Sequence, residues 1–415
     1  MVTVKCSYTV VPSEPTPKGP LWLSGIDQMA AWTHIPTLYI YKPNQNLDNF
    51  VERMRESLSK ILVHYYPLAG QLRWIEHSRL ELDCNEKGAT LLLAESPKTL
   101  DEYGNFEPNH SITELFPQVD YSKSIEETHL LLAQLTRFSC GGLSLGLAMT
   151  HSLVDGVSAI HFVNSWAKLA RGETLKEEEL PFLDRTVMRS ADPPEAPRFD
   201  HKANEFMPMP LILGSSDNIA ERKKETSVVL LPLSSDQVLK IKNRANEETA
   251  VSSLVRATRP YSRYEAITAH IWTSGSKARS HDKQQPTTVR FVGYAAQKVR
   301  EGIDKLTEEY MRSQLDFLAN QKNVDWIRGG LHIVGVLNGV FYGNPNFSIV
   351  SWLSMPVYDA DFGWGKPLYM GPGNLNEDGK ALILPSPSGD GSVIIALRFQ
   401  TAHMEAFQKF FYEDI

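Results

Sequence analysis

The sequence predicts two α/β domains of similar size. Segments typical of strands alternate with segments typical of helices on both sides of a polar, proline-rich stretch at residues 180–210. The length of 415 residues corresponds to two or three domains at roughly 150 residues each. We therefore expect a first domain over residues 1–185, a linker or crossover over 186–222 and a second domain over 223–415.

The first half opens with a strand-like run, VTVKCSYTV, that leads into a proline-rich loop. Aromatic and β-branched residues predict a strand over 37–43. Apolar residues at helical spacing predict an amphipathic helix over 47–66 and a second helix over 157–169. Between these helices, residues 79–96 are typical of a hairpin, and residues 129–151 of two strands joined by a glycine turn.

The second half repeats the pattern. Residues 228–248 are typical of a strand followed by a helix. Two further helices are expected over 264–279 and 301–321. The last hundred or so residues are strand-like and rich in Gly and Pro.

The composition is that of a globular protein, with 42% hydrophobic and 22% charged residues. The net charge of −7 comes from 42 basic and 49 acidic residues, so nucleic acid is not expected as a partner. Cys6, Cys84 and Cys140 are an odd number and widely spaced, which favours a reducing compartment over a disulfide framework or a zinc cluster. We see no signal peptide and no apolar run of about 18 residues, so we expect a cytoplasmic protein without a membrane span.

The stretch GGLSLGLAMTHSLVDG at residues 141–156 carries the first candidate chemistry. GLSLG matches the G-x-S-x-G motif of hydrolases, but Ser144 is expected within a strand rather than at a strand-to-helix turn. His151 and Asp155 are possible metal ligands, but no further ligand stands at suitable spacing. General base catalysis by His151 is the third reading, because an unperturbed imidazole accepts a proton near neutral pH. The alternative to all three is that His151 is a structural residue at a strand end, with its hydrogen bonds made and no chemical role.

A second motif, YDADFGWGKP, spans residues 358–367. Asp361, Gly363 and Gly365 are typical of a tight turn whose glycines supply positive φ. Trp364 differs, because its indole N–H is a donor that is able to face a developing oxyanion.

HSLVDG and DFGWG, in this order and spacing, resemble the plant BAHD acyl-CoA-dependent acyltransferases. YYPLAGQL, VNSWAKLARG, RYEAITAHIW and LPSPSGDGS agree, so the resemblance covers nearly the whole chain. It implies two chloramphenicol-acetyltransferase-like domains with mixed sheets and the active site at their interface. It also implies a monomer with acyl-CoA as co-substrate, no metal and no permanently bound cofactor.

The resemblance implies a mechanism as well. His151 takes a proton from the acceptor, the acceptor attacks the thioester carbonyl, and CoA leaves without a covalent enzyme intermediate. Trp364 is the implied oxyanion donor, and Asp155 is implied to orient the loop. A peptide-synthetase condensation domain shares the general motif, but that group has a second histidine where this chain has Thr150.

Within the family the chain is most similar to the hydroxycinnamoyl transferases that acylate spermidine. The segment HIPTLYIYKP resembles the one that lines the aromatic acyl pocket, which nominates His34, Thr37 and Tyr39. Shikimate-type enzymes carry an arginine in SW-x-R-x-P, where this chain has Ser354. A carboxylate acceptor loses a charge-assisted contact there, whereas a polyamine does not.

Further ligand contacts are expected from three residues. Asp359 is nominated to hold a cationic amine, and Ser262 and Lys366 to contact CoA. An exposed lysine is more often only solvated.

The chain departs from the family pattern after QQPTTVRF at residues 284–291. The family continues there with an arginine-bearing strand, a proline-rich loop and a Y-F-G-N motif, so some tens of residues are missing near 291–292. The leading interpretation is N-acylation of spermidine from a hydroxycinnamoyl-CoA. The alternatives are O-acylation of a shikimate-type or alcohol acceptor, and an inactive or purely ligand-binding variant.

Overall fold

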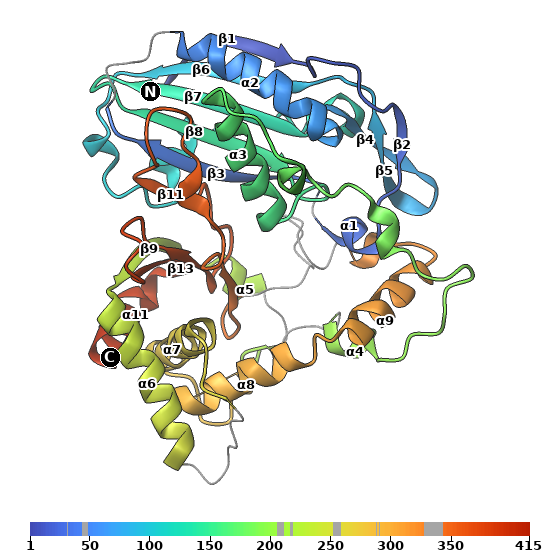
Figure 1. Ribbon diagram of the computed structural model, residues 1–415. Helices are drawn as coiled ribbons and strands as arrows, with labels where there is room; N and C mark the ends of the chain where they lie inside the picture. Colours follow the sequence, from blue (N-terminus) through green and yellow to red (C-terminus); the bar gives the residue numbers. More distant parts are fainter. Residues whose placement is uncertain are drawn as a thin grey trace. The chain divides into compact units, whose positions relative to one another are not determined.

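The computed structural model describes residues 1–30, 32–43, 49–205, 211–215, 219–251, 259–287, 289, 291–327 and 343–415 (Figure 1). The chain has a mixed α/β fold that divides into two compact, sheet-containing units. The first unit comprises Met1–Pro197, Gln314–Ile333 and Met355–Asn374. The second comprises Arg198–Ser313, Val334–Ser354 and Leu375–Ile415.

The first unit contains a six-stranded sheet in which only the β6–β7 pair is parallel. The strand order is β1 (Thr3–Val10), β6 (Ala89–Ser96), β7 (Leu131–Phe138), β8 (Leu143–Thr150), β3 (His34–Tyr41) and β11 (Tyr369–Pro372). Every residue of β8 is buried, as expected for a central strand that is covered on both faces. The predicted pair of strands over 129–151 is confirmed as β7 and β8.

Helices α2 (Phe50–His64) and α3 (Gly156–Ala170) lie on one face of this sheet (Figure 1). Both were predicted from apolar spacing, and both bury their apolar stripe. Trp166 of α3 is fully buried, and its indole N–H donates to the hydroxyl of Ser57 on α2 at 3.0 Å. This hydrogen bond satisfies the buried indole and ties the two helices together.

The division of the chain differs from the predicted boundaries, because Gln314–Ile333 and Met355–Asn374 were both expected in the second domain. Residues Met355–Asn374, which carry the DFGWG motif, belong to the first unit. β11 pairs with β3, and the ladder is extended by Leu368 N donating to Ile40 O at 2.7 Å. Backbone groups along the outer edge of β3 are thereby satisfied, which is a physical reason for this strand to join the first unit.

The hairpin predicted over 79–96 is wrong. β5 (Arg79–Cys84) lies between β2 (Gly19–Leu21) and β4 (Gln71–Ile75) in a separate three-stranded sheet, whereas β6 pairs with β1 and β7. The link between β5 and β6 includes Gly88 at φ +90°, where an added Cβ would lie 2.5 Å from Val10 O. The link therefore redirects the chain into another sheet instead of folding it back.

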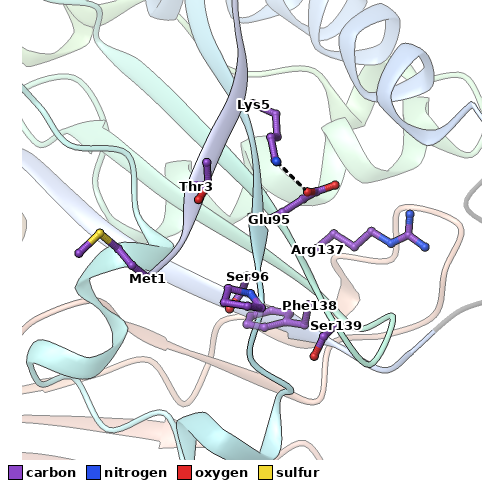
Figure 2. A pocket seen from close by; sticks show the side chains of 9 residues that line it. Met1, Thr3, Lys5, Glu95, Ser96, Arg137, Phe138 and Ser139 are labelled. Atoms are coloured by element: carbon purple, nitrogen blue, oxygen red, sulfur yellow. Dashed lines mark ion pairs between the residues drawn. The ribbon is translucent and has the colours of Figure 1, made fainter.

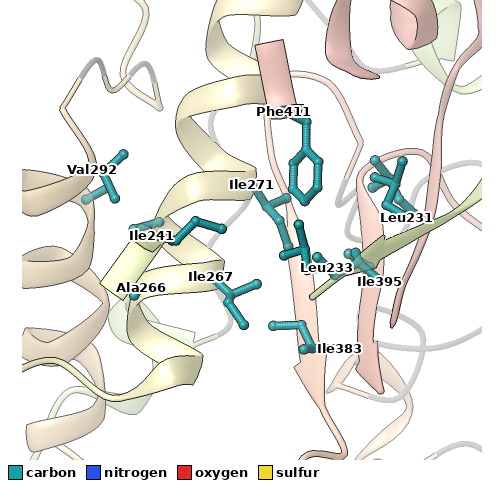
Figure 3. Close-up of a cluster of buried hydrophobic side chains, with 14 of the residues drawn as sticks. Leu231, Leu233, Ile241, Ala266, Ile267, Ile271, Val292, Ile383, Ile395 and Phe411 are labelled. Carbon is teal, nitrogen blue, oxygen red and sulfur yellow. The ribbon is translucent and has the colours of Figure 1, made fainter. Parts of the chain in front are cut away.

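The second unit is built on a four-stranded sheet with the order β10 (Ser348–Ser351), β12 (Lys380–Pro385), β13 (Val393–Gln400) and β9 (Thr226–Leu233). Its core lies between this sheet and its helices, as Figure 3 shows for Ile267 and Ile271 of α7 beside Ile383 and Ile395 of the sheet. The larger helices of the unit are α6 (Ser235–Val251), α7 (Arg263–Ala278), α8 (Val292–Asp304) and α11 (Thr401–Glu413).

Two helical regions differ from the predictions. The expected helix over 301–321 is interrupted, because α8 ends at Asp304 and α9 (Glu308–Ala319) begins after Thr307, whose hydroxyl accepts from Tyr310 N at 3.1 Å. The helix α11 was not predicted, although Met404, Phe407 and Phe411 are buried at helical spacing. The Gly- and Pro-rich character of the preceding residues masked that pattern.

The remaining elements are short. The helices α1 (Gly25–Met29), α4 (His201–Glu205) and α5 (Ile219–Arg222) have four or five residues each. The 3₁₀ turns are η1 (Tyr66–Ala69), η2 (Glu76–Ser78), η3 (Asp101–Tyr103), η4 (His110–Leu115), η5 (Ile125–Glu127), η6 (Glu177–Glu179), η7 (Arg185–Met188) and η8 (Val357–Asp359). Of the predicted linker 186–222, residues 206–210 and 216–218 lie outside the described residues. Over the described chain we find no helix with the length and apolar character that a membrane crossing requires.

Candidate active site

His151 follows the last residue of β8 and is half-buried. Its backbone N–H donates to Thr33 O at 3.2 Å, which continues the β3–β8 ladder by one step. Its ring nitrogen Nδ1 lies 3.1 Å from the carbonyl oxygen of Val154. A carbonyl oxygen only accepts, so Nδ1 carries a proton, and in the neutral ring the lone pair is then on Nε2. This is the tautomer that a general base needs if Nε2 is to take a proton.

The turn that follows His151 is closely hydrogen-bonded. The N–H groups of Leu153 and Val154 both donate to Thr150 O, at 3.1 and 3.3 Å. The hydroxyl of Ser152, which is 1% exposed, donates to Ala30 O at 3.1 Å. The backbone around His151 is thus held by hydrogen bonds inside the turn and by one to Ala30, the residue that ends α1.

Asp155 is the N-cap of α3. Its carboxylate accepts from Ser158 N at 2.8 Å, and its side chain is otherwise on the surface. This is the position that a loop-orienting residue occupies, because the cap fixes where α3 begins. Asp155 and His151 are not joined by a metal site, and the described part of the chain contains no group of three or more potential metal ligands.

His34 lies directly across the ladder from Thr150. Its Nε2 is 2.7 Å from His129 O and therefore carries the proton, so the hydroxyl of Tyr121 donates to Nδ1 at 3.1 Å. The same hydroxyl accepts from His34 N at 2.9 Å. Burial lowers the pKa of His34 to about 4, so the ring is neutral at physiological pH.

Thr37 and Tyr39 share one face of β3. The ladder pairs Thr37 with Leu147 and Tyr39 with Leu145, and His151 continues the same alternate positions of β8. Both hydroxyls are buried and have no hydrogen-bond partner among the described residues. Burial raises the pKa of the Tyr39 phenol. Two unpaired buried hydroxyls in a row with His151 are candidates for pairing with a polar ligand.

Trp364 does not lie beside His151. Its ring packs edge-on against Tyr41 at 5.6 Å and stacks on Phe362 at 5.5 Å. Tyr41 is seven residues from His34 along β3, which is on the order of 20 Å. The indole Nε1 is buried and unpaired among the described residues, but its location favours a packing role over the predicted oxyanion role.

The rest of the DFGWG loop is a tight turn, as its composition predicts. The carboxylate of Asp361 accepts from Gly363 N at 2.8 Å and from Gly365 N at 2.9 Å. Both glycines have positive φ, at +97° and +98°. Arg171 at the end of α3 donates to Asp361 O and holds the loop on the first unit.

Of the four residues nominated for the acceptor and for CoA, Asp359 and Lys366 lie in the first unit and Ser262 and Ser354 in the second. Asp359 and Lys366 form an ion pair with each other at 2.8 Å, with side chains 57% and 68% exposed. Ser262 is the N-cap of α7 and accepts from Glu265 N at 3.2 Å. Ser262 and Ser354 both belong to the second unit, so the structure of the first unit does not contain them.

Ser144 is excluded as a hydrolase nucleophile by its surroundings. It lies within β8, pairs with Ile40 in the ladder and is fully buried. A nucleophile elbow requires a serine at an exposed strand-to-helix turn.

Two surface cavities of the first unit have no predicted site residue in their lining other than a loop glycine. A cavity of about 450 Å³ lies at the ends of β1, β6 and β7, where Lys5 and Glu95 pair at 3.2 Å (Figure 2). A cavity of about 490 Å³ lies between α2 and the end of α3 and includes Gly363. Its other residues include Arg53, Lys60 and Arg171, which complement the carbonyl end of α3.

Sequence reasoning missed two residues that contact His34 or the turn after His151. Tyr121 holds His34, and Arg185 donates to Leu153 O at 2.8 Å. Tyr121 lies in an irregular segment and Arg185 in the proline-rich stretch, where no periodic pattern marks a residue as internal.

The chain matches a family model described as the Transferase family over residues 1–293 and 290–414. The two matched stretches meet where the sequence analysis expects a missing segment. Hydroxycinnamoyl-CoA:piscidic acid hydroxycinnamoyltransferase from Actaea racemosa is 42% identical over 456 aligned positions that cover 100% of each chain. Since this chain has 415 residues, about 41 of those positions (456 minus 415) hold none of its residues.

Two further relatives extend the comparison. Shikimate O-hydroxycinnamoyltransferase from Nicotiana tabacum is 36% identical, with 99% of each chain covered. Hydroxycinnamoyl-CoA:5-hydroxyanthranilate N-hydroxycinnamoyltransferase from Avena sativa is 33% identical, with 99% of each chain covered. These proteins include both O-acyl and N-acyl transferases.

Solved structures support the fold. Vinorine synthase superposes with a TM-score of 0.67 at 19% identity, covering 98% of this chain and 96% of that one. F. graminearum TRI101, solved with ethyl coenzyme A, superposes with a TM-score of 0.70 at 15% identity, covering 97% of each chain.

Proposed function

Because the chain belongs to the BAHD family of acyl-CoA-dependent acyltransferases, we propose that it transfers a hydroxycinnamoyl group from CoA to a small acceptor with His151 as general base. The observation that carries the proposal is the contact between His151 Nδ1 and Val154 O, which leaves the lone pair on Nε2. The three relatives described above all carry hydroxycinnamoyl transfer in their names, which supports the donor.

In the proposed reaction Nε2 takes the proton of the acceptor hydroxyl or amine as the acceptor attacks the thioester carbonyl. The tetrahedral intermediate then collapses, the C–S bond breaks, and the imidazolium returns the proton to the CoA thiolate. General base catalysis of this kind contributes roughly 10²–10⁴-fold. No covalent enzyme intermediate is needed, because donor and acceptor react directly.

The acyl group is proposed to lie along β3. Thr37 is three residues from His34, about 10 Å along the strand, a reach comparable with the length of a hydroxycinnamoyl group. The hydroxyls of Thr37 and Tyr39, which have no partner within the described chain, are then available to the phenolic end of the acyl group. His34 contributes a neutral imidazole whose two ring nitrogens are already engaged.

For the acceptor, a hydroxy acid is favoured over spermidine. The names of all three relatives described above give an acid or its anion as the acceptor. Asp359, nominated for a polyamine, is paired with Lys366. Spermidine is the second candidate. The chain has Ser354 at the position of the arginine expected in shikimate-type enzymes, and a polyamine does not need that cation.

The test is acceptor-dependent release of CoA thiol from p-coumaroyl-CoA by the purified chain, with product mass. Piscidic acid, shikimate and spermidine are supplied separately, and His151→Ala is assayed beside the natural chain. Release with an acid acceptor that disappears in the variant supports the proposal, and release only with spermidine assigns the second candidate. A folded chain without release from any acceptor would instead identify the inactive variant expected from the missing segment.

A further inference from the structure

We propose that Arg185 is a positioning residue that fixes the orientation of the His151 imidazole through the Leu153–Val154 peptide. The inference rests on the proposed function, since it assigns how the base of that reaction is held. One terminal nitrogen of Arg185 donates to Leu153 O at 2.8 Å. The other pairs with the carboxylate of Asp27 at 2.7 Å.

The contact acts on the peptide next to the histidine's own partner. Leu153 O and Val154 N belong to one planar peptide, so a contact to the carbonyl limits rotation of the whole group. Val154 N donates to Thr150 O at 3.3 Å from the opposite edge of the same peptide. The next carbonyl, Val154 O, accepts a hydrogen bond from His151 Nδ1–H at 3.1 Å. Arg185 therefore holds the peptide that directly precedes the one carrying the tautomer-defining carbonyl, Val154 O.

Asp27 fixes the guanidinium in turn. One of its oxygens accepts from Ser24 N at 2.8 Å in the capping box of α1, and the other meets Arg185. The side chains of Arg185 and Asp27 are 25% and 19% exposed, so water screens the pair only in part. The planar fork of arginine holds two acceptors at once in a fixed geometry, whereas the lysine ammonium is a compact point charge whose three donors rotate.

The segment that carries Arg185 has a local cap of its own and one further contact with another part of the first unit. Asp184 caps η7 by accepting from Thr186 N at 2.9 Å. Arg189 lies over the ring of Trp22, with its guanidinium carbon 5.1 Å from the ring centroid. Loss of the Arg185 side chain therefore releases the catalytic turn while the segment itself stays attached.

The kinetic test compares Arg185→Gln, Arg185→Lys and Asp27→Asn with Arg189→Gln, a matched loss of charge four residues away. For Arg185→Gln we expect kcat to fall roughly 10- to 100-fold, because small displacements of a catalytic group are costly. KM for acyl-CoA and acceptor should stay within about twofold, since no substrate contact is removed. Asp27→Asn should give a smaller kcat loss, Arg185→Lys an intermediate one, and Arg189→Gln none.

Guanidinium ion added to Arg185→Ala should restore part of kcat, because it replaces the missing donor. A variant that lost activity through general destabilisation of the fold would not recover in this way. Equal melting temperatures for Arg185→Gln and Arg189→Gln, with kcat reduced only in the first, support the inference. A lowered melting temperature with unchanged kcat, or equal kcat in both variants, would overturn it.

A readout independent of turnover separates this inference from the proposed function. Hydrogen exchange of the Leu153 and Val154 amides should accelerate at least tenfold in Arg185→Gln and not in Arg189→Gln. If the natural chain is inactive but this difference is seen, the proposed function fails and the positioning contact stands. Equal exchange in the two variants overturns the positioning contact whatever the activity.

Discussion

The Nδ1 atom of His151 lies 3.1 Å from the carbonyl oxygen of Val154, three residues further along the same turn. This short-range contact sets which ring nitrogen carries the proton. The turn that provides it is closed by two hydrogen bonds to Thr150 O, so the geometry follows from the end of β8 itself.

Replacement of His151 by Ala should reduce kcat by roughly 10²–10⁴-fold, because the proton acceptor is removed. The melting temperature should change little, since His151 is only half-buried. The matched control is His110→Ala, which alters an exposed histidine of η4. Equal activity of the two variants would exclude His151 as the base.

Trp364→Phe should leave kcat within about threefold of the natural value. The phenyl ring keeps contact with Tyr41 and Phe362, whose rings lie 5.6 and 5.5 Å from the indole. Trp364→Ala should instead lower the free energy of unfolding by about 3–5 kcal/mol, as expected for a large buried aromatic side chain. A kcat loss of about 100-fold in a stable Trp364→Phe protein would restore the oxyanion role.

Local patterns predicted most of the regular elements of the first unit but not how they associate. Helices α2 and α3 bury apolar stripes that are visible in the sequence, and β7 and β8 are joined by a short turn. β5 and β6 were assigned to one hairpin because they are close in sequence, yet they enter different sheets. Such pairing depends on contacts far along the chain, which no local period encodes.

The site shows the same limit. His151 and the DFGWG turn stood out in the sequence. Histidine accepts a proton near neutral pH, and glycine adopts the positive φ that such a turn requires. Trp364 was given a chemical role because its packing against Tyr41, seven residues from His34 along β3, is not visible in a motif. Arg185 was not singled out from the sequence. Its contact with Leu153 O depends on how a later, irregular segment packs against the turn before α3.

Asp155 should matter mainly as a cap. Asp155→Ala should lower the free energy of unfolding by about 0.5–2 kcal/mol, because the hydrogen bond to Ser158 N is lost. Asp155→Asn retains a side-chain oxygen and should stay close to the natural stability and activity. Urea denaturation with parallel activity assays checks both variants. A strong kcat loss in Asp155→Asn would show that the negative charge itself is required.

His34 should make stability depend on pH. Burial lowers its pKa from 6.5 to about 4, so the unfolded chain binds more protons between those values. Stability from this group is present above pH 6.5 and is lost as the pH falls toward 4, by about 2 kcal/mol between pH 7 and pH 5. His34→Gln should flatten the pH dependence of unfolding, and His110→Gln should not. The same slope in both variants would contradict the buried, neutral state of His34.

Arg279 and Asp378 form a buried ion pair in the second unit, with 3.1 Å between Nη2 and the carboxylate. The guanidinium lies 4.6 and 4.4 Å from the ring centroids of Phe347 and Phe399, and burial lowers the pKa of Arg279 to about 10. Arg279→Met should lower the free energy of unfolding by about 3–5 kcal/mol, because the Asp378 charge is left buried without its cation. The exposed Arg263→Met serves as control and should change it by less than about 0.5 kcal/mol. Similar urea midpoints for the two variants would mean that water reaches Asp378 once the arginine is removed.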